Sequence, residues 1–198
     1  MTTYILTGGR DRAHPDYGSK LTVELKKHHE KFRVLSCFFA EPEEYASMLA
    51  EKWQPWFEKR VGSIEKYDYA RMDSFLRQIK DFDILYLHGG PNRPLFDALD
   101  TFGDFAPLVA GKIVVGSSAG ANFIAKNYWG SSKQKPGKGR AILDVNVMVH
   151  YGSPDHEGRP RTAGDWDYEE ALFRDFIGTN EKIWHLPEGE VEVFEAKD

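Results

Sequence analysis

Residues 116–120 read Gly-Ser-Ser-Ala-Gly, which is the pattern G-x-S-x-G with Ser118 at its centre. An apolar run over 112–116 precedes the pattern and a helix-forming run follows it. Small neighbours allow a sharp strand-to-helix turn that lifts the serine hydroxyl above the sheet. The turn also leaves the Ala119 N–H at the start of a helix, where it can stabilise an oxyanion. We predict that Ser118 is a nucleophile; the alternative is a serine that only caps the helix.

A second glycine-rich turn, His88-Gly89-Gly90-Pro91-Asn92, ends the apolar strand that comes immediately before the nucleophile strand. Such a turn can direct a backbone N–H toward the same anion, and we expect that N–H to come from Gly90. The alternative is a tight turn that needs glycine only for its positive φ. We predict that His88 is a packed residue at a strand end and not a base.

The general base must be one of seven histidines, which are His14, His28, His29, His88, His150, His156 and His185. None has an H-E-x-x-H or similar spacing, so we expect no metal site. An α/β-hydrolase would use the order Ser…Asp…His and could recruit His185. Its glycine-rich oxyanion turn lies well upstream of the nucleophile, however, whereas here it ends the preceding strand. This arrangement favours a different hydrolase sheet.

The elements that must position these residues alternate between strands and helices. Apolar runs predict strands at 4–6, 32–39, 61–67, 83–87, 112–116, 141–149, 183–186 and 191–194. Helical spacing predicts helices at 17–31, from Pro42 to a stop or kink near Pro55, at 69–80, at 94–110 with a break near Gly103, from 120 to about 128, and at 168–177. Residues 130–140, rich in Gly, Ser and Lys, predict a mobile surface loop. The pattern indicates an α/β fold, a three-layer sandwich with a mostly parallel sheet, in which ligands bind at the carboxyl ends of the strands.

Composition narrows the classes of protein. The chain has 198 residues and a formal net charge of −5, which predicts one domain over 1–198 and argues against a nucleic-acid binder. One cysteine, no apolar run long enough to span a bilayer and no signal-peptide pattern favour a cytoplasmic protein without membrane contact. The oligomeric state stays open, with a homodimer among the alternatives.

Four motifs in order resemble the peptidase E family of serine peptidases, the aspartyl dipeptidases. They are the turn at 88–92, Gly116-Ser117-Ser118-Ala119-Gly120-Ala121-Asn122, Val149-His150-Tyr151 and Leu186-Pro187-Glu188-Gly189. Their order and approximate spacing match over nearly the whole chain. The resemblance implies a class I glutamine-amidotransferase-like fold and a peptidase that needs no cofactor and takes small peptides as substrates.

The resemblance also implies a Ser-His-Glu triad. Ser118 would be the nucleophile, His150 the base and then the acid, and Glu188 the group that orients the imidazole. All three are predicted at strand ends, where side chains from separate strands converge. The alternatives are a strand-end histidine at 150 and a plain turn at 187–189, with Asp144 and Asp155 as rival orienting groups.

Substrate recognition follows the family less closely. Pro91 stands between the glycine pair and Asn92, where the family has asparagine directly, and residues 152–161 do not align with the family's aspartate-binding segment. Arg159 and Arg161 could bind a carboxylate bidentately, or could be surface charges of a loop. We retain Asn92, Arg159 and Arg161 as candidate substrate-binding residues. A related amidase or esterase, or a ligand-binding member without catalysis, remains an alternative.

Overall fold

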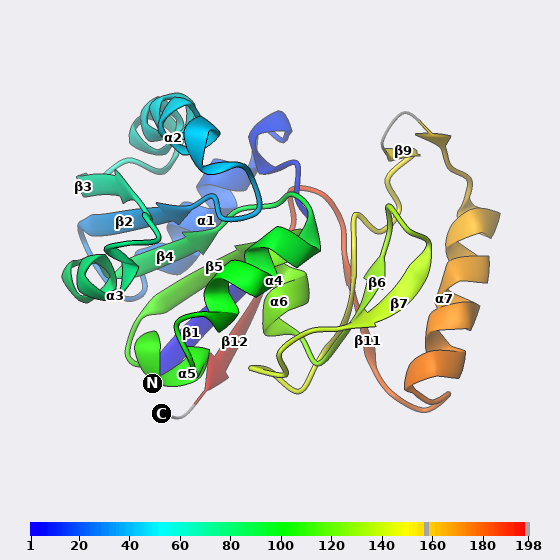
Figure 1. Ribbon diagram of the computed structural model, residues 1–198. Coiled ribbons are helices and arrows are strands. Elements are labelled where there is room, and N and C mark those ends of the chain that lie inside the picture. The colour runs from blue at the N-terminus through cyan, green and yellow to red at the C-terminus, as the bar shows by residue number, and fades with distance from the viewer. Residues whose placement is uncertain (157–158, 197–198) are drawn as a thin grey trace.

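The computed structural model describes residues 1–156 and 159–196, and the chain forms two sheets that lie side by side (Figure 1). The larger sheet has the strand order β12 (Val191–Ala196), β1 (Thr2–Thr7), β5 (Ile113–Ser117), β4 (Ile84–Leu87), β2 (Phe32–Cys37), β3 (Ile64–Tyr69). Its strands are parallel except for β12, which pairs antiparallel with β1. The smaller sheet has the order β11 (Ile183–Leu186), β8 (Asn146–Val149), β6 (Asn127–Gly130), β7 (Lys135–Lys138). A short ladder joins β9 (Asp155–His156) to β10 (Arg159–Pro160).

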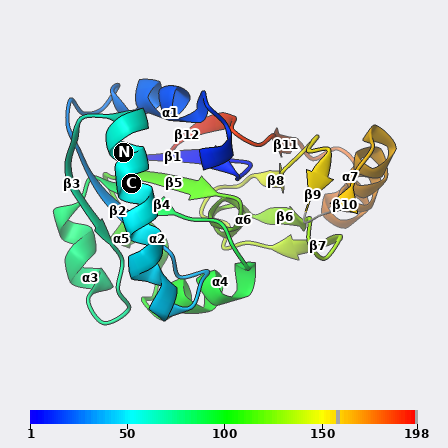
Figure 2. The ribbon, with the colours of Figure 1, turned by 90° about the horizontal axis from the view of Figure 1, so that it is seen from above.

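Helices cover both faces of the larger sheet, because its central strands are apolar on both faces. In β4, Leu85 and Leu87 pack in one core cluster while Ile84 and Tyr86 pack in another. The first face is covered by α3 (Phe75–Gln78), α4 (Asn92–Asp100), α5 (Phe105–Leu108) and α6 (Ala119–Ile124). The second face is covered by α1 (Tyr17–Leu25) and by the end of α2 (Glu43–Trp56), which continues as a π-helical turn over Phe57–Val61. Figure 2 shows α1 and α4 on opposite sides of the sheet.

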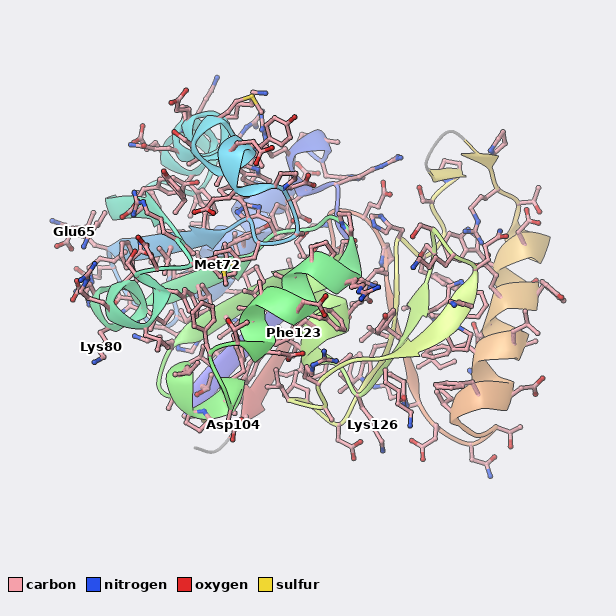
Figure 3. The ribbon with its side chains drawn as sticks, viewed as in Figure 1. Glu65, Met72, Lys80, Asp104, Phe123 and Lys126 are labelled. Atoms are coloured by element: carbon pink, nitrogen blue, oxygen red, sulfur yellow. The ribbon has the colours of Figure 1, made fainter. Side chains whose placement is uncertain are left out.

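The smaller sheet joins the same core through α6. Val147 and Val149 of β8 belong to the cluster that contains the buried helix α6, including Phe123 (Figure 3). On the other face, Trp129 and Met148 pack against α7 (Ala163–Ile177). Helix α6 therefore contacts both sheets, and the residue just before it lies where the sheets meet.

The α/β fold with mostly parallel strands is confirmed, while some boundaries differ from expectation. Residues 130–140 are not a loop, because Lys135–Lys138 pair antiparallel with Asn127–Gly130. Pro55 does not end its helix, since the chain stays helical to Val61. The α-helix expected over 69–80 covers only Phe75–Gln78, followed by a 3₁₀ turn. No described helix is long and apolar enough to cross a membrane.

A buried ion pair fastens α7 to the smaller sheet. Glu169 of α7 lies 2.5 Å from the guanidinium of Arg161, and both side chains are almost fully buried. The other oxygen of Glu169 accepts a 2.6 Å hydrogen bond from the indole N–H of Trp129 on β6. The Arg161 guanidinium also stacks over the ring of Trp166. One carboxylate thus links β6, α7 and the segment that precedes α7.

Removing that carboxylate should destabilise the fold, because the buried guanidinium and the buried indole N–H that contact it would be left without a partner. We expect Glu169→Ala to lower the free energy of unfolding by about 3–5 kcal/mol, measured by urea denaturation. Asp144→Ala is the matched control, since Asp144 pairs with Lys126 at the surface and is 84% exposed. It should cost at most about 1 kcal/mol. Equal losses in the two variants would contradict the role given to Glu169.

Candidate active site

Three predicted residues converge where the two sheets meet. Ser118 follows β5 of the larger sheet, whereas His150 follows β8 and Glu188 follows β11 of the smaller sheet. Backbone hydrogen bonds join these strand ends: the Ser118 N–H donates to the Thr7 carbonyl and the His150 N–H donates to the Gly8 carbonyl. The end of β1 therefore bridges the strand ends that carry the serine and the histidine.

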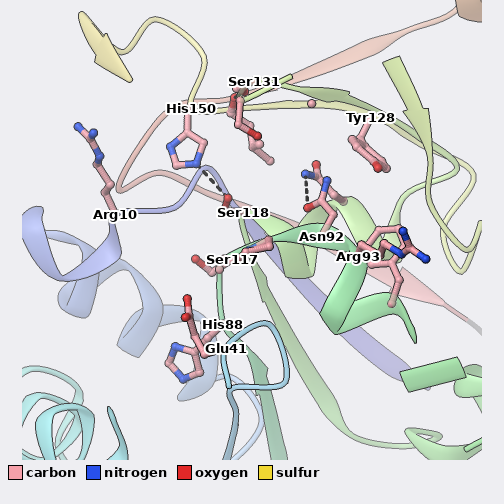
Figure 4. Close-up of a pocket in the computed structure, with 18 of the residues that line it drawn as sticks. Arg10, Glu41, His88, Asn92, Arg93, Ser117, Ser118, Tyr128, Ser131 and His150 are labelled. Atoms are coloured by element: carbon pink, nitrogen blue, oxygen red, sulfur yellow. Dashed lines mark hydrogen bonds between the residues drawn. The ribbon is translucent and has the colours of Figure 1, made fainter. Parts of the chain in front are cut away.

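The three side chains form one hydrogen-bonded chain. Ser118 Oγ lies 2.9 Å from His150 Nε2, and His150 Nδ1 lies 2.9 Å from Glu188 Oε1. Figure 4 shows the first of these contacts, with the imidazole pointing at the hydroxyl. Side-chain exposure is 10% for His150 and 11% for Glu188, so both groups lie in a largely water-excluded setting. This arrangement places a base beside a hydroxyl and a carboxylate behind the base.

The backbone at the nucleophile is strained. Ser118 has φ 48° and ψ −103°, which a non-glycine residue adopts only when the surrounding structure imposes it. This is the sharp strand-to-helix turn that the G-x-S-x-G pattern predicts. His150 also has a positive φ, 58°. The side chains of Ser118 and His150 thus both extend from turns that the packing of the two sheets holds in place.

Glu188 is held by more than the histidine. The Arg10 Nε lies 3.5 Å from Oε1 and the His14 Nε2 lies 3.5 Å from Oε2. Burial alone would raise the pKa of Glu188, but the hydrogen bond and charge of His150, with Arg10 and His14, outweigh it and hold that pKa below its ordinary value. The carboxylate therefore stays ionised in the pH range where a histidine base works.

The sequence did not single out Arg10, and it offered His14 only as one of the seven histidines that could be the base. The available signal was the glycine pair Gly8-Gly9 at the end of β1, with the charged residues directly after it. Gly9 in this turn has φ +97°, and a Cβ there would lie 2.6 Å from the imidazole of His150 and 2.9 Å from Ser118 Cβ. Glycine is required at position 9 because the chain passes directly against both reacting side chains.

Asp11, also in this turn, is a buried acid that the sequence did not single out. It accepts hydrogen bonds from the Thr7 hydroxyl, at 2.7 Å, and from the Tyr86 hydroxyl, at 2.5 Å. Burial raises the pKa of Asp11, although hydrogen bonds from Tyr86, Ser117 and Thr7 oppose that effect. Asp11 thus ties the turn after β1 to Thr7 of β1 and to Tyr86 of β4.

The turn expected to hold the oxyanion lies against the nucleophile. A Cβ on Gly89 would lie 3.2 Å from Ser118 Cβ and 3.7 Å from its Oγ. The Gly89–Gly90 peptide is therefore adjacent to the hydroxyl, and the first N–H groups of α6, beginning with Ala119, have no partner within the helix. His88 stays away from the hydroxyl. It is buried, stacks on Phe38 and contacts Ser36, and burial holds the pKa of His88 well below its ordinary range.

A pocket of about 900 Å³ opens over Ser118 and His150. Asn92 lines it and accepts a 3.2 Å hydrogen bond from the Asn122 amide (Figure 4). Its basic lining residues are Arg10, Arg12, Arg93, Lys133, Lys135 and Arg140, and its acidic ones are Asp11, Glu41 and Asp97. Aromatic side chains line two parts of the wall, Phe38 and Trp53 on one side and Phe96 and Tyr128 on the other.

The two arginines expected to bind substrate are not brought to this pocket by the described structure. Arg161 forms an ion pair with Glu169 and stacks on Trp166 beside α7. The ion pair compensates the buried charge of the guanidinium, which therefore does not reach the pocket. The side chain of Arg159 lies outside the described residues, as does that of the rival orienting group Asp155. The other rival, Asp144, pairs with Lys126 at the surface.

Other potentially reactive side chains are buried or make contacts elsewhere in the structure. Cys37 is buried inside β2, and burial raises the pKa of its thiol to about 12, so it offers no thiolate. His185 contacts Glu170 and stacks on Tyr151. Among the side chains that the structure describes, no three His, Cys, Asp or Glu are arranged to hold a metal ion.

Comparison with known proteins gives a structural match. No family model matches the sequence, and no curated protein matches it. The solved structure of a "Putative Peptidase E Protein" from Listeria monocytogenes EGD-e superposes with a TM-score of 0.61 at 15% identity and covers 100% of both chains. At this identity the match establishes the fold, and this chain has the architecture of that protein from end to end.

The lowered pKa of Glu188 predicts a pH dependence of stability. The unfolded chain protonates this group at its ordinary value of 4.5, whereas the folded chain resists protonation to lower pH. Its contribution is therefore complete above that value and is lost as pH falls through the folded pKa. We expect the free energy of unfolding of the intact protein to exceed that of Glu188→Gln at about pH 6 and the gap to narrow toward about pH 3. A gap that stays constant across this range would contradict the stated environment of Glu188.

Proposed function

We propose that the protein is a serine peptidase that hydrolyses small peptides, including dipeptides with an N-terminal aspartate, through an acyl-enzyme. One observation carries the proposal: Ser118, His150 and Glu188 form a hydrogen-bonded chain with both contacts at 2.9 Å, and Ser118 and His150 line a pocket large enough for a peptide. A purely structural role for His150 would explain neither the open pocket beside it nor the strained backbone of Ser118.

The first half of the reaction forms the acyl-enzyme. Ser118 Oγ attacks the scissile carbonyl carbon while its proton moves to His150 Nε2. Glu188 accepts the Nδ1–H of the imidazole, which fixes the required tautomer and stabilises the imidazolium that forms. The carbonyl oxygen becomes an oxyanion that the N–H groups of Gly90 and Ala119 stabilise. His150 then donates its Nε2 proton to the departing amine, and the C–N bond breaks.

The second half returns the free enzyme. A water molecule attacks the ester carbon and gives its proton to His150, a second oxyanion forms at the same N–H groups, and its collapse expels Ser118 Oγ, which takes the proton back. Both halves use the same proton-transfer path between Ser118 and His150. The chemistry needs only these residues and water.

Ser118→Ala tests the nucleophile directly. We expect turnover to fall at least ~10³-fold with the thermal unfolding midpoint nearly unchanged, because only the reacting hydroxyl is lost. A fluorophosphonate probe should label the intact protein at Ser118 and leave this variant unlabelled. Ser117→Ala, which removes a neighbouring hydroxyl that bonds to Asp11, should have a mild effect. An intact protein that resists the probe would favour a binding protein, and labelled protein that spares peptides would favour an amidase or esterase.

A preference for acidic peptides is supported by the basic side of the pocket. Lys133 and Lys135 line the pocket from the β6–β7 hairpin, and the ion pairs of the described residues leave both of them available. Arg93 and Arg140 line the same region but pair with Asp97 and Asp100. We therefore propose the hairpin lysines, in place of Arg161, as residues that attract a substrate carboxylate, while the role of Arg159 stays a prediction.

The double variant Lys133→Met/Lys135→Met tests this assignment. We expect the ratio of kcat/KM for Asp-X over Ala-X dipeptides to fall about tenfold, the low end for charged contacts because both lysines are exposed. Lys138→Met lies on the same hairpin, is exposed and does not line the pocket, so it should keep the ratio. Equal hydrolysis of Asp-X and Ala-X by the intact protein would remove the acidic preference and leave the serine chemistry in place.

A further inference from the structure

Glu41 holds a carboxylate against the turn proposed to bind the oxyanion. It lies in the segment between β2 and α2, is partly exposed and lines the pocket. A Cβ on Gly90 would lie 3.0 Å from Glu41 Oε1 and 2.7 Å from Ala40 Cβ. Glycine at position 90 therefore lets this segment approach, and Figure 4 shows Glu41 beside His88 and Ser117, on the side of Ser118 away from Asn92 and Tyr128.

The protein itself supplies no ion-pair partner for this carboxylate among the described residues, whose ion pairs do not include Glu41. Its pocket neighbours Phe38, Trp53 and His88 are aromatic, and His88 stays neutral because burial lowers its pKa. Arg12 also lines this side, with its guanidinium 5.4 Å from the centre of the Trp53 ring. Glu41 thus carries its charge into the pocket next to a wall of aromatic rings.

A lone carboxylate is unfavourable at this position. The reaction builds negative charge at the oxyanion, and a fixed negative charge close by in a partly water-excluded pocket opposes it. A substrate cation that lies between the Glu41 carboxylate and the oxyanion would remove this repulsion. In a peptide cleaved after its first residue, the α-ammonium is separated from the scissile carbonyl carbon by only the Cα atom, so it accompanies that carbonyl to Ser118.

We propose that Glu41 binds the α-ammonium of the substrate's first residue and so makes the enzyme cleave one residue from a free N-terminus. The proposal rests on the peptidase function above. A charge-assisted hydrogen bond fixes the ammonium, and the aromatic faces beside Glu41 favour a cation as well. A blocked N-terminus loses this bond and leaves the uncompensated carboxylate beside the oxyanion, so the penalty falls on the chemical step and not on binding alone.

Three matched substrates test the proposal: Asp-Leu, N-acetyl-Asp-Leu, and succinyl-Leu, which is Asp-Leu without its α-amino group. We expect the intact protein to favour Asp-Leu over both others by at least about a hundredfold in kcat/KM. Glu41→Gln should lower kcat/KM for Asp-Leu by about tenfold to a hundredfold, as expected for one charge-assisted hydrogen bond, and should not lower it for succinyl-Leu. The preference for a free amine should therefore collapse. Glu44→Gln, an exposed acid on α2 outside the pocket, is the control and should behave as the intact protein.

Fluorophosphonate labelling separates this inference from the peptidase proposal. The probe carries no ammonium but builds negative charge at the same N–H groups, so Ser118 of Glu41→Gln should be labelled at least as fast as in the intact protein. Slower labelling would mean that Glu41 supports the nucleophile's structure, and would overturn the inference. Equal cleavage of Asp-Leu and N-acetyl-Asp-Leu would also overturn it while leaving the peptidase intact. The inference would also be overturned if the protein cleaved N-acetylated peptides that begin with lysine and this cleavage depended on Glu41. Glu41 would then bind the lysine side chain and not the α-ammonium. Absence of labelling and of all hydrolysis in the intact protein would instead refute the peptidase function.

Discussion

The turn after β1 must touch both sheets, and the geometry of the candidate site depends on this constraint. Thr7 and Gly8 accept backbone hydrogen bonds from Ser118 and His150, so these two adjacent residues set the separation between Ser118 at the end of one sheet and His150 at the end of the other. A Cβ on Gly8 would collide with the Leu186 and Pro187 carbonyls just before Glu188. One short segment therefore fixes the position of the serine, the histidine and the acid relative to one another.

The electrostatics of the site follow from the same turn. His150, with Arg10 and His14, keeps Glu188 ionised, while burial shifts Asp11 toward its neutral form. The two carboxyl groups thus have opposite pKa shifts, because the neighbours of Glu188 outweigh the effect of its burial, whereas the hydrogen bonds to Asp11 do not. The carboxyl group of Glu41 is in a third kind of environment, because it faces the open pocket. This position suits the role we propose for it, which is to bind a cation of the substrate.

Much of this arrangement was predictable from sequence, since it rests on local patterns. The strand ends at Ser118, His150 and Glu188 follow apolar runs that remain strands in the structure, and the small residues around Ser118 indicate the turn that the backbone shows. The β6–β7 hairpin was missed because Pro136 and Gly137 have poor strand propensity, and only pairing with Tyr128 and Trp129 makes them a strand.

Long-range contacts explain the other differences. Nothing local distinguishes Arg161, which pairs with Glu169 across the start of α7, from an arginine that faces a substrate. Glu41 precedes a helix whose first turn carries further acidic residues. The sequence alone therefore suggests only another negative charge that stabilises the start of the helix. The division into two sheets is likewise decided by which strands meet, a choice that alternating strands and helices leave open.

The placement of Glu188 has a consequence for the order in which the molecule is made. Its oxygen closes the hydrogen-bonded chain, and the strand just beyond it, β12, pairs with β1, the first strand of the chain. A ribosome delivers Ser118 and His150 long before either of these pieces emerges. The nascent chain therefore carries its serine and histidine without the acid proposed to orient the imidazole, and the proposed triad is assembled only when β12 has paired with β1. The proposed activity should therefore appear only after the segment that carries Glu188 and β12 has left the ribosome.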